Sequence, residues 1–321
     1  MKSTSFKAIF YCLIPPLIWG GMFPLANSIS PTVNAFHMTL IRYGLAAAIL
    51  VLMLVRAEGR GAFATDGKVV RLFLLGTSGF AGFGLLAFTA LNYTSAPNVS
   101  LIMAMMPAIG AIVGAVATRK MPPLYTVGSI VLAFIGVALV ITQGDFGKLA
   151  SGQLGLGELL ALLGAICWVT YTRGAGAFPG WSALRYTTLT TALGCISIAA
   201  AVIVASAVGY VSAPTVEHVL AAWPQLAYLV IFAGVVAVLF WNKGIGMLGA
   251  LNGTLFMNLV PVTTFTISMI SGFRPGPIAL IGAAIVLTSL LLNNWLSRRA
   301  AARATSAAVM PAAREPLSQS R

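Results

Sequence analysis

Residues 96–107, APNVSLIMAMMP, and residues 250–261, ALNGTLFMNLVP, are two versions of one pattern, and this pair decides the fold. Aligned on their final prolines, the stretches share alanine, asparagine, leucine, methionine and proline at five positions. Such similarity indicates an internal repeat, although chance similarity between two apolar helices is the alternative explanation. The pair therefore predicts a chain built from two related halves.

The composition around this repeat is that of a membrane protein. Of 321 residues, 59% are hydrophobic and 8% are charged, whereas a soluble domain carries about 25% charged residues. Most of the chain sorts into apolar runs of about 18 to 25 residues, the length that crosses a bilayer. We expect an all-α integral membrane protein with ten transmembrane helices. The expected spans are residues 8–28, 34–55, 70–91, 95–117, 123–142, 156–173, 182–208, 223–242, 248–271 and 276–296.

Each half of the chain holds five expected helices, in residues 8–142 and 156–296. Because five is odd, the second half starts on the opposite side of the membrane, and the halves form inverted repeats, an architecture typical of transporters. The polar stretch 143–155 is the expected periplasmic or extracellular linker. Residues 1–7 are expected in the cytoplasm, as is the basic tail 297–321, whose Ala, Ser and Arg content predicts disorder.

The positive charges set the expected orientation. With the amino terminus in the cytoplasm, sixteen of the 19 lysines and arginines lie in cytoplasmic ends and loops, Lys148 and Arg274 lie outside, and Arg42 lies within a span. This asymmetry follows the positive-inside rule and predicts a multi-pass protein of the cell (inner) membrane with both termini cytoplasmic. The net charge of +13 is spread over helix ends, so the expected partner is the lipid bilayer and not a nucleic acid.

Five short motifs follow one another along the chain. They are residues 19–24 (WGGMFP), Arg42 with 45–47 (LAA), 91–96 (LNYTSA) leading to Pro107, 157–168 (GELLALLGAICW) and 241–243 (WNK). In order and spacing they resemble the EamA branch of the drug/metabolite transporter superfamily, over about residues 8–296. The resemblance implies two inverted five-helix repeats and transport, commonly outward, of small polar or amphipathic solutes. The glutamates that the family places after the helix-four proline and its repeat counterpart are absent from residues 117–120 and 271–274, so no role of theirs carries over.

Two charged side chains lie in or beside the expected spans. Arg42 is about two turns into its helix, where exposure to lipid would cost several kcal/mol. It is expected either to bind an anionic group of the substrate or to hold the fold by bonding carbonyls or an acid on another helix. Glu158 is the acid nearest a span, and it is expected to accept Arg42, to carry a proton, or to stabilise a helix amino terminus.

Asparagines and prolines of the repeated stretches extend the candidate substrate site. Asn98, Asn252 and Asn258 flank the two repeat prolines and offer amide groups to a solute. Pro107 and Pro261 each free a backbone carbonyl one turn back for a solute or a side chain, or they serve only as packing kinks.

Aromatic residues fall into two expected groups. Trp19 and Trp168 lie deep in their spans, and together with Tyr171 they are expected to form an apolar wall around the solute. The other group is expected to anchor the protein at the membrane interface. It consists of Trp223, Trp241 and Trp295.

Two stretches of small residues predict close helix packing. They are residues 110–114 (GAIVG) and 249–253 (GALNG), each with glycines four positions apart. Such faces let helix backbones approach closely. They serve either scaffold packing around a pore or association into a homodimer.

The chemistry missing from the chain also restricts its function. No His, Cys and carboxylate cluster has metal-ligand spacing, and no Gly-Lys-Ser/Thr phosphate loop is present, so we expect no metal, no cofactor and no enzymatic activity. The predicted function is a secondary transporter that exports small metabolites, such as amino acids or amphipathic compounds, by alternating access. A non-transporting membrane sensor or an integral membrane enzyme is the alternative. Because Glu158 is the one candidate proton carrier, a facilitative or exchange mechanism competes with proton coupling.

Overall fold

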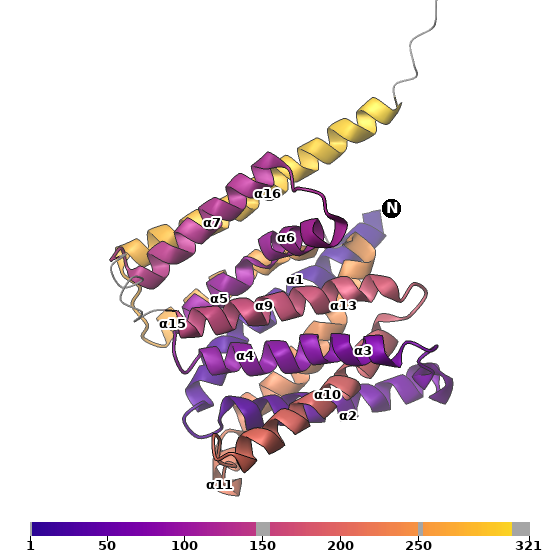
Figure 1. Cartoon of the computed structure of the whole chain (residues 1–321), viewed down its shortest axis with the longest axis vertical. Coiled ribbons are helices and arrows are strands. Elements are labelled where there is room, and N and C mark those ends of the chain that lie inside the picture. The colour runs from indigo at the N-terminus through magenta and orange to yellow at the C-terminus, as the bar shows by residue number, and fades with distance from the viewer. Residues whose placement is uncertain (1, 146–154, 250–252, 310–321) are drawn as a thin grey trace, which may run out of the picture.

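A computed structural model describes residues 2–145, 155–249 and 253–309, and every regular element within those ranges is a helix (Figure 1). The first half contains α1 (Lys2–Ile29), α2 (Ala35–Glu58), η1 (Arg60–Phe63), α3 (Val69–Gly76), η2 (Thr77–Gly82), α4 (Phe83–Ala90), α5 (Ala96–Ala104), α6 (Met106–Thr118) and α7 (Leu124–Thr142). The second half contains α9 (Leu156–Gly174), η3 (Ala175–Ala177), α10 (Ala183–Ala207), α11 (Val216–Ala221), α12 (Trp223–Ala227), η4 (Tyr228–Val236), α13 (Ala237–Leu248), η5 (Thr254–Asn258), α15 (Leu259–Ile270) and α16 (Pro277–Val309).

Several of these helices are long and apolar enough to cross a bilayer. Within the described residues there are 8 such helices, or up to 9 if one bent pair counts as a single span. The eight are Phe6–Ile29, Ala35–Glu58, Val69–Ala90, Leu124–Thr142, Leu156–Ala177, Ala183–Ala207, Trp223–Leu248 and Pro277–Ala300. They coincide with eight of the ten spans expected from the sequence. The chain is therefore a multi-pass helical membrane protein. The two remaining expected spans are those that contain the repeated stretches 96–107 and 250–261.

Neither of the two repeated stretches, 96–107 and 250–261, forms part of a straight span. Helices α5 and α6 meet at a bend of 45°, which directly precedes Pro107 in the second position of α6. In the second copy, the short 3₁₀ turn η5 leads into α15 just before Pro261, and the apolar helix there covers only Phe256–Ile270. Proline lacks the backbone N–H that an uninterrupted helix needs and clashes with the preceding turn, so each copy breaks there. Asn252 lies outside the described residues.

The third helix of each half contains a π-helical segment. In the first half η2 separates α3 from α4, and in the second half η4 separates α12 from α13. A π-helical turn pairs backbone groups five residues apart and interrupts the regular ladder. These interruptions lie inside the bundle, where they meet side chains of neighbouring helices.

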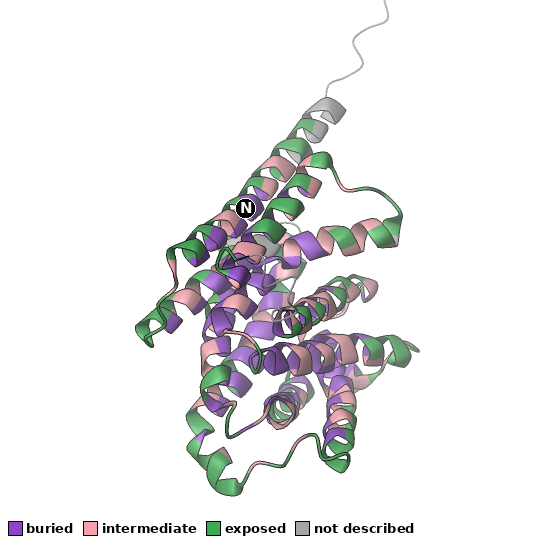
Figure 2. Cartoon of the chain, turned by 60° about the vertical axis from the view of Figure 1, so that its left-hand side comes forward, coloured by how far each residue is buried: buried purple, intermediate pink, exposed green. Residues whose placement is uncertain are grey.

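The helices pack around a buried aromatic and aliphatic core and turn apolar residues outward. Figure 2 shows buried positions between the helices and exposed positions along their outer faces. The exposed positions include large apolar side chains such as Leu52, Val116 and Ile203, of which Val116 is 75% exposed. An outer surface of this kind is matched to lipid, because the helices satisfy their own backbone groups and need no water there.

Helix α7 packs along α16, and the two lie side by side at one edge of the molecule (Figure 1). Gly136 and Gly282 allow this contact, since a Cβ on either residue would lie within 2.7 Å of the carbonyl oxygen of the other. Helix α16 continues beyond residue 296 to Val309, where the sequence predicted a disordered tail. The stretch is rich in alanine and arginine, which have high helix propensity, and this extends the preceding helix.

Candidate solute pocket and buried arginine

A pocket of about 760 Å³ lies among α6, α7, α9, α13 and α16, within the range of about 300–1,000 Å³ typical of small-molecule sites. Its lining is Met106, Pro107, Gly110, Ala111, Ala115, Lys120, Pro122, Pro123, Tyr125, Thr126, Trp168, Val169, Thr172, Arg173, Trp241, Met257, Asn293, Asn294, Ser297 and Ala300. Pro107 and Trp168 are the sequence-predicted site residues that it includes. The pocket thus draws on both halves of the chain.

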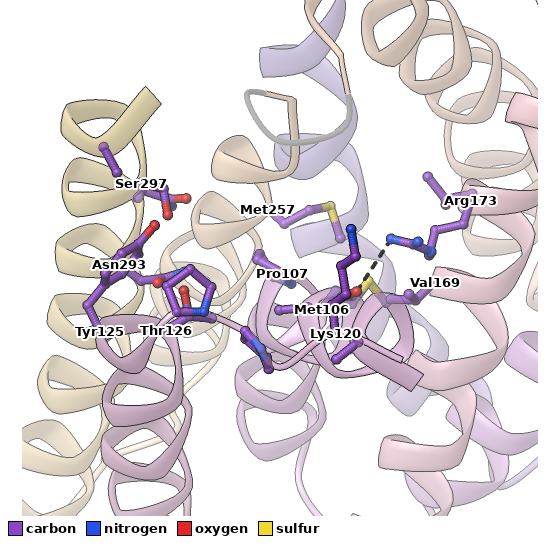
Figure 3. Close-up of a pocket in the computed structure, with 18 of the residues that line it drawn as sticks. Met106, Pro107, Lys120, Tyr125, Thr126, Val169, Arg173, Met257, Asn293 and Ser297 are labelled. Atoms are coloured by element: carbon purple, nitrogen blue, oxygen red, sulfur yellow. Dashed lines mark hydrogen bonds between the residues drawn. The ribbon is translucent and has the colours of Figure 1, made fainter. Parts of the chain in front are cut away.

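The two sides of this pocket differ in charge. Figure 3 shows Lys120 and Arg173 on one side, with Tyr125 and Asn293 on the other. The Arg173 guanidinium donates to the carbonyl oxygen of Gly110 at 3.5 Å. Among the described residues that line the pocket, none is acidic. One wall is therefore cationic without a carboxylate to neutralise it.

The small-residue face in residues 110–114 accommodates this arginine. A Cβ on Gly114 would lie 3.3 Å from Nη1 of Arg173, and a Cβ on Gly110 would lie 3.8 Å from Val169. The two glycines therefore face α9 within the same chain. Of the second small-residue face, Gly253 packs against Ile245 and Cys12. Both contacts are intramolecular helix packing, the first of the two uses expected for these faces.

Several polar atoms in the pocket wall are buried and lack a hydrogen-bond partner in the described part of the chain. They are Nε1 of Trp168, Oγ1 of Thr172, Nε1 of Trp241, Oδ1 of Asn293 and Nδ2 of Asn294. Buried polar atoms in folded proteins are nearly always paired. Their concentration around one cavity marks positions where a solute or water supplies the missing partner.

Trp241 corrects the sequence analysis. It was expected to anchor the protein at the membrane interface, yet it is only 1% exposed and lines the pocket. Its ring packs edge-on against Trp19, with centroids 5.6 Å apart. Hydrophobicity places a tryptophan near a helix end but does not say which face of that helix it occupies. The one sequence feature that could have pointed to an inward position is that Trp241 belongs to the motif at residues 241–243.

A second, very small cavity of about 10 Å³ adjoins the first, room for about one water molecule. It is lined by Trp19, Met22, Phe23, Arg42, Phe83, Met103, Met106, Trp168, Met257 and Val260. Met106, Trp168 and Met257 line both cavities. These three side chains form the partition between the large pocket and Arg42.

Arg42 is buried, with 1% of its surface exposed. Its Nη2 donates to the carbonyl oxygen of Ala233 at 3.2 Å, and its guanidinium carbon lies 4.6 Å from the ring centroid of Tyr43 and 5.4 Å from that of Phe88. Its Nε and Nη1 have no partner in the described residues, and no ion pair there involves this arginine. Arg42 thus makes one of the expected contacts with a carbonyl on another helix, at Ala233. Its Nε and Nη1 remain free to donate beside the small cavity.

The aromatic residues predicted to line the site lie near Arg42 and the two cavities. Trp19 donates from Nε1 to the same Ala233 carbonyl at 3.1 Å, and its ring centroid lies 5.3 Å from that of Trp168. Tyr171 lies 5.2 Å from Trp168, and its hydroxyl accepts from Nδ2 of Asn242 at 2.9 Å. Trp19 and Trp168 thus border the cavities, whereas Tyr171 is packed behind them.

The remaining candidates divide into two places. Thr94 donates to Oε1 of Glu158, in the first turn of α9, and accepts from Nδ2 of Asn98 at 3.0 Å. Neither Asn98 nor Glu158 lines the two cavities with Arg42 and Trp168. Asn258 is buried with both amide atoms unpartnered in the described residues and follows the lining residue Met257. Pro261 is buried beside the lining residue Val260.

Sequence reasoning missed the polar residues at the mouth of the large pocket. Lys120, Arg173, Asn293 and Asn294 follow or end apolar spans, where basic and amide residues usually mark topology and nothing more. They line one pocket because the ends of α6 and α9 meet the middle of α16.

Comparisons with known proteins place this architecture. The model of the EamA-like transporter family matches residues 6–142 and again residues 155–295. The chain is 32% identical over 302 residues to "Uncharacterized transporter YrdR" of Bacillus subtilis (strain 168), covering 93% of this chain and 94% of that protein. It is 33% identical over 259 residues to "Uncharacterized transporter YyaM" of the same organism, covering 80% and 83%. A crystal structure with 19% identity matches 93% of this chain and 99% of its own with a TM-score of 0.62, which supports the fold.

Proposed function

The chain belongs to the EamA-like transporter family and is a membrane transporter, and we propose that it is a secondary transporter that works by alternating access. The eight long spans, the bent pair α5 and α6, and the shorter segment of η5 and α15 supply ten crossings as two inverted five-helix repeats. Two matches of one family model support this division. In such an architecture the halves rock around a midplane site.

The observation that carries the proposal is the order of the two cavities along the helices. The large pocket opens where α6 and α9 end and α16 passes beside them, near the exposed residues Lys120, Arg173 and Ala300. The small cavity lies deeper and touches Arg42, which is seven residues after the start of α2. The pathway is therefore open at one end and closed by packed aromatic rings and Arg42 toward the other.

The positive-inside rule assigns the open end to the cytoplasm. We infer from the same charge asymmetry that both termini lie in the cytoplasm, so that this conformation faces inward, and we propose the cell (inner) membrane as the location. A pocket that loads from the cytoplasm fits an exporter of small metabolites such as amino acids or amphipathic compounds.

The predicted residues take separate roles in this proposal. Solute enters the large pocket, and movement of Met106, Trp168 and Met257 admits it to Arg42 and Trp19 at the midplane. The unpartnered nitrogens of Arg42 then bind an acceptor group of the solute. Glu158, hydrogen-bonded to Thr94, is the carboxyl available for proton coupling, and facilitative transport or exchange is the competing mechanism.

Flux in proteoliposomes tests the proposal. Full-length protein is reconstituted and loaded with pooled radiolabelled amino acids and amphipathic metabolites, with and without a pH gradient. We expect protein-dependent, saturable flux of at least one pool, and Glu158→Gln removes its response to the gradient if transport is proton-coupled. A folded protein that moves no pool would overturn the carrier assignment and favour a sensor or an enzyme.

A further inference from the structure

We propose that the large pocket selects amphipathic carboxylates: small organic acids with an apolar body and one anionic end. This inference deepens the proposed function by naming the solute class of the same pocket. It rests on the charge of the wall, on the kind of hydrogen bond that the wall leaves open, and on the shape of the apolar floor.

The charge of the wall favours an anion. Lys120 and Arg173 are the charged residues among the described lining, and both are cationic. Two acids elsewhere in the described chain have partners outside the pocket: Asp66 pairs with Arg185 at 3.1 Å, and Glu158 accepts from Thr94. A concave site lined by one sign of charge beside a low-dielectric membrane concentrates the opposite charge.

The open hydrogen bonds favour an acceptor. Of the five unpartnered wall atoms, three only donate: Nε1 of Trp168, Nε1 of Trp241 and Nδ2 of Asn294. Oγ1 of Thr172 can donate or accept, and Oδ1 of Asn293 only accepts. The side chains of Lys120 and Arg173 also only donate, so donors are in the majority. A carboxylate only accepts, through two oxygens, and charge-assisted bonds to it are stronger than neutral ones. An ammonium group would bring further donors to a wall already rich in them.

The floor of the pocket fits the apolar body. Met106, Val169 and Met257 line it together with Trp168 and Trp241. Methionine side chains adapt to irregular apolar shapes. The pocket therefore limits the size of the apolar part of the solute more than its shape. Tryptophan faces also attract cations, and an amine is therefore the decisive competitor.

A matched set of three ligands tests the class. Full-length protein in nanodiscs is titrated by calorimetry with 3-phenylpropionate, 3-phenylpropionamide and 3-phenylpropylamine, which share one body and differ in charge. We expect the carboxylate to bind at least roughly tenfold more tightly than the amide, and the amine to bind more weakly than both. Equal affinities, tighter binding of the amine, or no saturable binding of the carboxylate would each overturn the proposal.

Variants locate the binding in this pocket. Arg173→Gln and Lys120→Gln should each lower the affinity for 3-phenylpropionate severalfold toward that for the amide, and leave the amide affinity unchanged. Arg56→Gln is the control, because it removes one positive charge from an exposed position of α2 outside the pocket. An equal loss in the control would attribute the preference to net charge and contradict a built site.

Flux and binding separate the two proposals. Carboxylate-selective binding with no flux of any solute leaves the pocket assignment intact and rejects the transporter mechanism. Flux of amines alone keeps the transporter and rejects the carboxylate class.

Discussion

The two π-helical segments occupy comparable places in the two halves, and each meets side chains of the other half in a different way. In the second half, the Ala233 carbonyl of η4 accepts from both Trp19 and Arg42. In the first half, η2 makes a steric contact: a Cβ on Gly79 would lie 2.4 Å from Cγ of Tyr171, and Ser78 donates to the Cys167 carbonyl at 2.9 Å. One interruption anchors a charge, while the other lets an aromatic ring approach the backbone.

This difference shows how related halves produce an asymmetric pathway. Two copies of the same backbone feature leave one buried arginine on one side only, because α2 carries Arg42 whereas the buried positions of α10 include four threonines, Thr187, Thr188, Thr190 and Thr191. The η4 segment therefore holds a buried charge through its backbone, whereas η2 is joined to neighbouring helices by Gly79 and by the hydrogen bonds of Thr77 and Ser78. Substitutions at each segment should separate effects on transport from effects on folding.

The largest expected effect comes from Arg42→Met. Replacing a buried ion pair by apolar residues of similar volume is often neutral or stabilising by about 1–4 kcal/mol. We expect the same direction for Arg42, because two of its guanidinium nitrogens lack partners in the described residues. We therefore expect the melting midpoint of the purified protein to stay or rise while solute flux falls at least about tenfold. The solute flux of Arg42→Lys should lie between that of the wild type and that of Arg42→Met. A variant that keeps wild-type flux would show that Arg42 is not a solute ligand.

Gly79→Ala should have the next largest effect, and it acts on stability. The added methyl group overlaps the ring of buried Tyr171, and overpacking of a filled core costs about 1–3 kcal/mol. Gly234→Ala in η4 should cost less, since its nearest atom would be 3.1 Å away.

Thermal unfolding of the two glycine variants in the same detergent measures this difference. Gly246→Ala in α13 is the control, because nothing lies within 4 Å of its added methyl group. If Gly234→Ala proved as damaging as Gly79→Ala, the steric distinction between the two π-helical segments would be wrong.

Trp19→Phe should be intermediate. It removes the Nε1 donor to the Ala233 carbonyl and weakens the ring contacts with Trp168 and Trp241. A lost hydrogen bond contributes about 0.5–1.5 kcal/mol, so the melting midpoint should fall by a few degrees and flux should fall with it. Loss of stability at full flux would place Trp19 in the scaffold alone.

Ser78→Ala should have the smallest effect. Its hydrogen bond to the Cys167 carbonyl joins η2 to α9, and side-chain hydrogen bonds between membrane helices contribute about 0.6 kcal/mol on average. Flux should be unchanged and the melting midpoint barely lowered. A strong transport defect here would mean that η2 moves during the cycle and is not a static wall.

The sequence by itself determined the membrane class, eight of the spans and the breaks at the repeat prolines. These properties depend on apolar run length, on charge content and on the missing N–H of Pro107 and Pro261, all of which act locally along the chain. Motif order was also enough to indicate the family. The candidates Trp19, Arg42 and Trp168 were found because polar or bulky residues deep in a span are costly or conspicuous.

Only the tertiary structure decided which residues share a space. It turned Trp241 inward from an expected interface position, paired Glu158 with Thr94 and not with Arg42, and brought Lys120, Arg173 and Asn294 to one pocket. The physical reason is that hydropathy predicts which segments cross the bilayer but not how each helix is rotated about its axis. That rotation is set by packing against neighbouring helices. The two copies of the repeated stretch predicted a site between the halves, and helix packing decided which residues line the pocket found there.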